Sequence, residues 1–121
     1  MILDNKTFTQ KALRTETSEF RNQPNPRILH AAIGLCTESG ELIDALKKSI
    51  FYGRELDVVN VKEEAGDILW YLAILFDEIG TDFETEQARV IAKLEARFPE
   101  KFTEEAAYNR DLKTEREILE K

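Results

Sequence analysis

The chain has 121 residues, of which 42% are apolar and 34% are charged, enough for one small hydrophobic core. Its 24 acidic and 17 basic residues give a net charge of −7 at pH 7, and such a chain repels nucleic-acid backbones. Cys36 and His30 are single residues of their types, which excludes an internal disulfide and a zinc site of Cys and His ligands within these residues. The longest apolar run, residues 68–76, is far shorter than the roughly 20 residues that cross a bilayer, and residues 1–6 do not resemble a signal peptide. We expect a single cytoplasmic domain over residues 1–121, with neither a nucleic-acid nor a membrane partner.

Apolar residues recur with the 3.6-residue period of amphipathic helices, and alternating β patterns are absent. The sequence therefore predicts an all-α fold, an antiparallel bundle of four to five helices with its core at about residues 27–111. In chain order, the predicted helices cover residues 8–20, 27–51, 57–79, 81–98 and 103–109, followed by a charged tail.

The predicted helix boundaries depend on local capping signals. Asn25 and Pro26 open the second helix, as an N-cap followed by a proline at the first helical position. A capping box of Thr81 and Glu84 opens the fourth helix, which ends before Pro99. The remaining signals are Gly53 and Gly80, which end the second and third helices, and Asp57, which caps the third.

The third predicted helix contains a run, residues 68–76, that is apolar on every face. A helix of this kind has to be covered on every side, and four or five helices in so small a chain can hardly do so. We therefore expect a homodimer, or a dimer of dimers, in which a second subunit covers the outer face.

Four carboxylates lie at positions that face the interior of the predicted bundle. On the second helix, Glu38 falls within the apolar stripe and Glu41 follows three residues later; on the third, Glu64 and Asp67 repeat this spacing. A charge in a core is unfavourable unless it is paired or bound to a metal ion. If the two helices are antiparallel neighbours, the four carboxylates meet, and oxygen ligands of this kind suit a hard divalent ion such as magnesium.

The alternative interpretation is that these acids are ordinary residues of solvated helix faces. A single ExxE or ExxD pair is weak support for a metal site in so acidic a chain, and Glu63 points about 100° away from Glu64. The coincidence of both pairs with the inward stripe favours the metal site. Other acids are interpreted as solvated: Asp77, Glu78, Glu84, Glu86, Glu104, Glu105 and Glu117.

Two segments resemble MazG-like proteins of the all-α nucleoside triphosphate pyrophosphohydrolase superfamily: HAAIGLCTESGEL at residues 30–42 and EEAGDILWYL at residues 63–72. Relatives include dimeric dUTPases, dCTP pyrophosphatases and phosphoribosyl-ATP pyrophosphatases. The family signature is ExxE, a spacer and ExxD, and here 22 residues separate Glu41 from Glu64. The resemblance continues to residue 111, but Val90 stands where the family often has Asn.

The resemblance implies magnesium-dependent cleavage of a nucleoside triphosphate to the monophosphate and pyrophosphate, with manganese as a possible substitute. By position, Glu38, Glu41, Glu64 and Asp67 are the implied metal ligands, with Glu38 and Glu41 also assigned to catalysis. A carboxylate that the metal does not fully occupy can take the proton of the attacking water, and Glu41 is our choice. The chain offers no Ser/His/Asp or Cys/His arrangement for covalent catalysis.

Five further residues are expected to contact the nucleotide substrate. Lys93 and Arg97 follow a basic stripe on the fourth helix and match the family pattern, and Lys47 is a second phosphate candidate. Tyr71 follows Asp67 by four residues, at a position where some relatives stack the base. His30 lies eight residues before Glu38, so it either approaches the base or has only a role in the core.

The competing function is a catalytically silent, nucleotide-binding or regulatory module with the same fold. All four acidic positions of the signature are present, which favours an active enzyme that controls or cleans the nucleotide pool. The sequence does not specify the base, the sugar or the number of metal ions.

Overall fold

The computed structural model describes residues 2–121, and every regular element within them is a helix, which confirms the predicted all-α class. There are six rather than four to five: α1 (Asn5–Leu13), α2 (Pro26–Tyr52), α3 (Val58–Ile79), α4 (Phe83–Arg97), α5 (Glu104–Tyr108) and α6 (Leu112–Glu120). None of these helices combines the length and apolar character that a membrane span requires.

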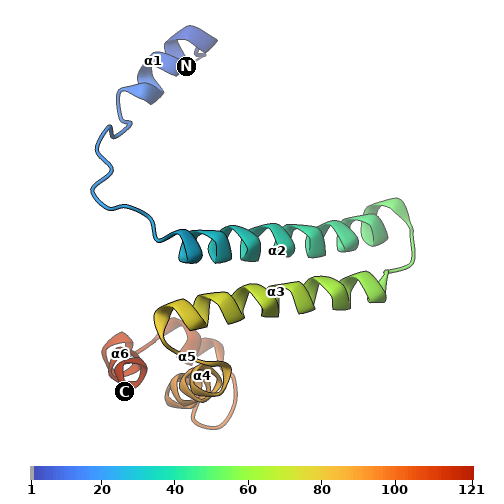
Figure 1. Ribbon diagram of the computed structural model, residues 1–121, viewed down its shortest axis with the longest axis vertical. Helices are drawn as coiled ribbons and strands as arrows, with labels where there is room; N and C mark the ends of the chain where they lie inside the picture. The colour runs from blue at the N-terminus through green and yellow to red at the C-terminus, as the bar shows by residue number, and fades with distance from the viewer. Residues whose placement is uncertain (1) are drawn as a thin grey trace.

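Helices α2 and α3 lie side by side along their lengths and form an antiparallel pair, which we call the hairpin (Figure 1). Asn25 caps α2 by accepting hydrogen bonds from two backbone N–H groups, and Pro26 occupies the first turn, as predicted. Asp57 caps α3 by accepting one hydrogen bond, from the backbone N–H of Asn60. Both helices end at a glycine in the left-handed region, Gly53 with φ 70° and Gly80 with φ 78°, where other residues are strained.

Helices α4, α5 and α6 gather near the C-terminal end of α3, and α4 packs against α6 (Figure 1). The contact is polar at two points. The guanidinium of Arg97 donates to the carboxylate of Glu115 at 2.5 Å, and that of Arg89 donates to the backbone carbonyl of Leu119. These two hydrogen bonds hold α6 against α4.

The first helix differs from the predicted range of residues 8–20. Asp4 accepts a hydrogen bond from the backbone N–H of Thr7 and thereby starts α1 three residues earlier. The helix stops at Leu13, because the hydroxyl groups of Thr15, Thr17 and Ser18 compete for backbone hydrogen bonds. In Figure 1, α1 stands apart from the hairpin at the end of an extended segment.

The start of α4 was predicted wrongly by one residue. Asp82 is the N-cap and accepts from the backbone N–H of Thr85, so the expected capping box of Thr81 and Glu84 does not form. The hydroxyl of Thr81 instead donates to the carboxylate of Glu86 at 2.6 Å. Aspartate and threonine are both good N-caps, and the neighbouring positions left the choice open to tertiary contacts.

The predicted charged tail is also wrong, because its residues form α6. Asp111 caps this helix and accepts from both the backbone N–H and the hydroxyl of Thr114. Glu115 is only 4% exposed, since it lies between the guanidinium groups of Arg97 and Arg110. A capping residue and a buried ion-pair network thus help to order this charged segment.

The apolar run of α3 is not covered within the chain. Leu69 is 55% exposed and Trp70 is 57% exposed, while the buried apolar residues of the described chain are two alanines of α2. The accessible surface of residues 2–121 is 10361 Å², whereas a compact monomer of this mass exposes roughly 6,700 Å². A single chain therefore leaves a large apolar area in contact with water.

Candidate metal centre and nucleotide site

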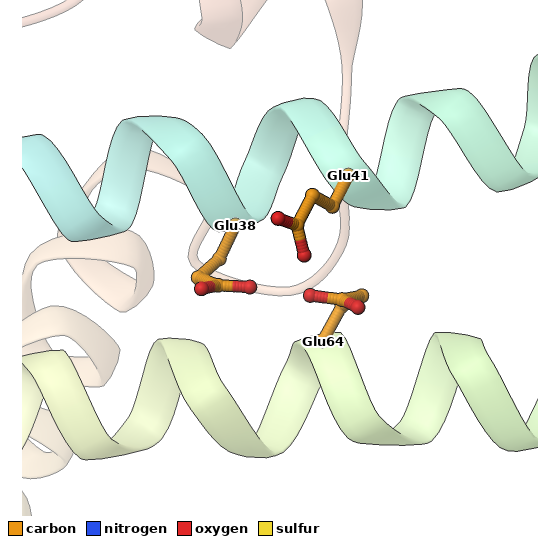
Figure 2. A group of neighbouring side chains, drawn as sticks. All are labelled: Glu38, Glu41 and Glu64. Atoms are coloured by element: carbon orange, nitrogen blue, oxygen red, sulfur yellow. The ribbon is translucent and has the colours of Figure 1, made fainter.

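Three glutamates face one another across the middle of the hairpin. Glu38 and Glu41 project from α2 towards Glu64 of α3 (Figure 2). One carboxylate oxygen from each lies within 4.8 Å of the others. Because Glu38 and Glu41 are three residues apart on one helix, both fall on the face that α3 contacts. We call these three residues the acidic cluster.

The acidic cluster is unfavourable as a set of ionised groups. A hydrogen bond shared with Glu38, burial, and the proximity of Glu41 together raise the pKa of Glu64 to about 8. Glu64 is 4% exposed, Glu38 is half-buried and Glu41 is exposed. With no cation close to the three carboxylates, a proton at Glu64 relieves part of their repulsion.

The carboxylate oxygens of the acidic cluster meet the requirements of a hard divalent ion. The Oε2 atoms of Glu38 and Glu64 are buried and have no hydrogen-bond partner among the described residues. Buried polar atoms are normally paired, so two buried oxygens without a hydrogen-bond partner fit a site that binds a cation. Magnesium prefers oxygen ligands and binds through a few carboxylates while it keeps part of its water shell.

Asp67, the fourth predicted ligand, is not grouped with Glu38 and Glu41. It forms a second group with Glu63 and Glu64, in which one carboxylate oxygen from each again lies within 4.8 Å of the others. Glu64 is therefore common to both groups. Glu63, which the helical spacing placed about 100° away from Glu64, is close enough to share a cation with Asp67.

An aromatic group adjoins the acidic cluster on the side away from the α2–α3 turn. His30, Trp70 and Tyr71 contact one another edge to face, with ring centroids 5.0 to 6.4 Å apart. We call these three residues the aromatic cluster. The Tyr71 ring lies close to the backbone of α2, and this closeness depends on Gly34, because a Cβ added at that position would lie 2.1 Å from the ring. The pattern predicted Tyr71 and His30 but not the contribution of Trp70.

The three basic residues that were predicted to bind phosphate lie on α2 and α4. Lys47 of α2 lies over the ring of Tyr52, with its ammonium 5.8 Å from the ring centroid. Lys93 and Arg97 are on α4, which Figure 1 shows near the C-terminal end of α3 rather than beside the acidic cluster. Lys93 is half-buried and makes no ion pair within residues 2–121, whereas Arg97 is bound to Glu115.

No sequence pattern predicted the partner of Arg97. Glu115 accepts hydrogen bonds from Arg97 and Arg110, which holds the pKa of Glu115 down at about 2, despite its burial. The local sequence signal for α6 was Asp111 followed three residues later by Thr114, a spacing that is typical of the start of a helix.

Comparison with known families shows that residues 29–102 match the MazG nucleotide pyrophosphohydrolase domain. No curated protein and no solved structure matched the chain. The matched residues span the hairpin with both acidic pairs and the aromatic cluster, and they end before α5 and α6. The model of that domain covers more than half of the chain, and on this basis the chain belongs to the MazG nucleotide pyrophosphohydrolase family.

Proposed function

We propose that this protein hydrolyses a nucleoside or deoxynucleoside triphosphate to the monophosphate and pyrophosphate in a magnesium-dependent reaction, as an enzyme of the cytoplasmic nucleotide pool. The observation that carries the proposal is the acidic cluster, with its two buried, unpaired carboxylate oxygens at the centre of a domain of the pyrophosphohydrolase family.

In the proposed reaction, the oxygen of a water molecule attacks the α-phosphorus, the bond from that phosphorus to the bridging oxygen breaks, and pyrophosphate leaves. Glu38, Glu41, Glu64 and Asp67 would hold magnesium, and manganese is an expected substitute. When bound, the ion neutralises phosphate charge and increases the acidity of nearby water. Glu41, the exposed member of the acidic cluster, accepts the proton of the attacking water at its carboxylate.

The aromatic cluster is the proposed contact for the nucleobase. Tyr71 and His30 lie on the faces of α3 and α2 that also carry the acids, one to two helical turns away. Stacking on these rings orients the nucleotide so that its phosphates lie against the acids. Lys47 is the proposed phosphate contact on the hairpin, and Lys93 is a further proposed substrate contact, which Arg97 can join only if it exchanges Glu115 for the nucleotide.

The test is to incubate the protein with a panel of ribo- and deoxynucleoside triphosphates, with and without magnesium, and to identify the products. We expect monophosphate and pyrophosphate in equal amounts, only with magnesium, and none with Glu38→Ala or Asp67→Ala. Glu105→Gln, which changes an exposed acid of α5, is the control and should be fully active. Binding of nucleotide and magnesium without cleavage of any triphosphate would reject the enzyme and support the silent-module alternative.

We also propose that two copies of the chain associate through the apolar surface of the hairpin. The support is the area that one chain leaves exposed, about 3,700 Å² more than a compact monomer of this mass, so two chains together have more than enough surface for the roughly 2,000–5,000 Å² in total that obligate dimers bury. The arrangement could be a dimer or a dimer of dimers.

Sedimentation analysis tests the association. We expect a mass of two or four times 14.0 kDa for the wild-type protein. Leu69→Glu, which places a charge on the exposed apolar face of α3, should shift the mass towards that of one chain. Ile2→Glu, in the fully exposed N-terminal segment, is the control and should leave the mass unchanged. A wild-type protein with the mass of a single chain would contradict the proposal.

A further inference from the structure

A polar cavity of about 260 Å³ lies at the closed end of the hairpin, where α2 turns into α3. Two cations, three carboxylates and one amide line it: Lys48, Arg54, Asp44, Glu55, Asp57 and Asn60. We call it the turn pocket. It is large enough for a small polyanion with part of its hydration, since one water occupies about 30 Å³ of liquid.

The turn pocket continues the acidic cluster along the same helix faces. Lys48 follows Glu41 by seven residues on α2, and Asn60 precedes Glu64 by four residues on α3. Both spacings correspond to whole turns, so the pocket lies one to two turns from the acidic cluster, towards the turn. The aromatic cluster lies at a similar distance on the opposite side. Towards the α2–α3 turn, the hairpin therefore carries first the aromatic cluster, then the acidic cluster and then the two cations of the turn pocket.

Three charges of the turn pocket already have partners, whereas Arg54 and Glu55 have none among the described residues. Lys48 is paired with Asp44 at 2.9 Å, and Asp57 caps α3 by accepting from the backbone N–H of Asn60 at 3.1 Å. Arg54 forms no ion pair within residues 2–121, although Glu55 lines the same pocket. A guanidinium offers several donors in one plane and suits phosphate oxygens.

We propose that the turn pocket holds the pyrophosphate end of the substrate, the β- and γ-phosphates, and releases it as the product, with Arg54 as its principal contact and Lys48 as the second. This proposal rests on the proposed function, because only an attack at the α-phosphorus over the acidic cluster places two phosphates beyond the acids. The three carboxylates repel a free tetraanion, so the pocket takes pyrophosphate as its magnesium complex.

The experiment compares the wild-type protein with Arg54→Ala and Lys48→Ala by calorimetry. Magnesium pyrophosphate is titrated at a fixed concentration of free magnesium, and a nucleoside monophosphate is titrated separately. We expect Arg54→Ala to weaken pyrophosphate binding by about tenfold or more, as loss of a charge-assisted hydrogen bond does, and to leave monophosphate binding unchanged. Arg116→Ala, in the exposed part of α6, is the matched control and should change neither affinity.

Two results would overturn the assignment of the turn pocket: pyrophosphate affinity that is equal in the wild-type protein, Arg54→Ala and Lys48→Ala, or an equal loss of monophosphate binding. The calorimetry is independent of turnover. If no triphosphate is cleaved but Arg54 still determines pyrophosphate binding, the proposed reaction fails and the turn pocket remains a pyrophosphate site. If triphosphates are cleaved and the Arg54 variant binds pyrophosphate normally, the pocket fails and the reaction stands.

Discussion

Glu64→Gln is expected to stabilise the metal-free protein at neutral pH and to abolish its activity. At pH 7.5 the folded wild-type chain either holds a proton at Glu64 that the unfolded chain has lost or bears a third charge beside Glu38 and Glu41, whereas glutamine keeps the size of the side chain and is neutral in both states. The melting temperature in EDTA at pH 7.5 should rise by several degrees. The same change removes a proposed metal ligand, and pyrophosphate release should fall by at least about a hundredfold.

The pH dependence of this effect follows from the raised pKa of Glu64. Below pH 4.5 the group is protonated in both the folded and the unfolded chain, and its contribution to stability is fully present. Between pH 4.5 and about 8 the folded chain holds a proton that the unfolded chain has lost, so the free energy of unfolding falls as the pH rises. We expect the melting temperature in EDTA to decline over this window in the wild-type protein, and to decline less with Glu64→Gln.

Two comparisons complete this test. Glu117→Gln removes an exposed carboxylate of α6 and should reproduce neither the stabilisation nor the loss of activity. Magnesium should raise the melting temperature of the wild-type protein at pH 8 and have a smaller effect on Glu64→Gln. Equal melting curves of wild type and Glu64→Gln in EDTA at pH 8 would show that the carboxylates do not repel one another in the folded chain.

Glu115→Gln is expected to loosen α6 from α4. The carboxylate is buried between two arginines, and its loss leaves Arg97, which is 16% exposed, with a buried charge and no counter-ion. At neutral pH, amide hydrogens of α6 should exchange at least about tenfold faster, because the local opening of this helix then needs less free energy. Hydrogen exchange followed by mass spectrometry measures the effect on residues 112–120.

The acid range provides an independent check, because the pKa of Glu115 is lowered and not raised. Its contribution is present above pH 4.5 and is lost as the pH falls towards about 2, where the folded carboxylate takes up a proton. The difference between wild type and Glu115→Gln should therefore shrink over this range. Glu120→Gln removes the partner of Arg116 in an exposed pair and should have little effect. Unchanged exchange of α6 in Glu115→Gln would contradict the proposed role of the ion pairs.

The hairpin could be predicted from sequence because its boundaries depend on neighbouring residues alone. Asn25 with Pro26, Asp57, and the two left-handed glycines each act through their own backbone, so the signals needed no knowledge of the fold. The acidic residues were predictable for the same reason. The 3.6-residue period assigns side chains to faces, and two adjacent antiparallel helices bring those faces together.

The errors arose where a distant contact or a choice between equivalent caps decides the structure. Glu115 looked like part of a charged tail because its two arginine partners are 5 and 18 residues away. Asp82 and Thr81 are both acceptable caps, and the sequence did not rank them. The position of Arg97 depends on α6, whose order the pattern did not predict. The roles of the basic and aromatic residues towards a nucleotide stay predictions.

The acids of the proposed metal centre all fall within thirty consecutive residues, 38–67, on two helices joined by the short segment at residues 53–57. Closing so short a connection costs little chain entropy, and helical hairpins with local contacts form rapidly. We therefore expect these carboxylates to approach one another early in folding, before α4 and α6 dock. The cations present at that moment decide how easily the hairpin closes, which makes the ionic surroundings of the nascent chain part of its folding pathway.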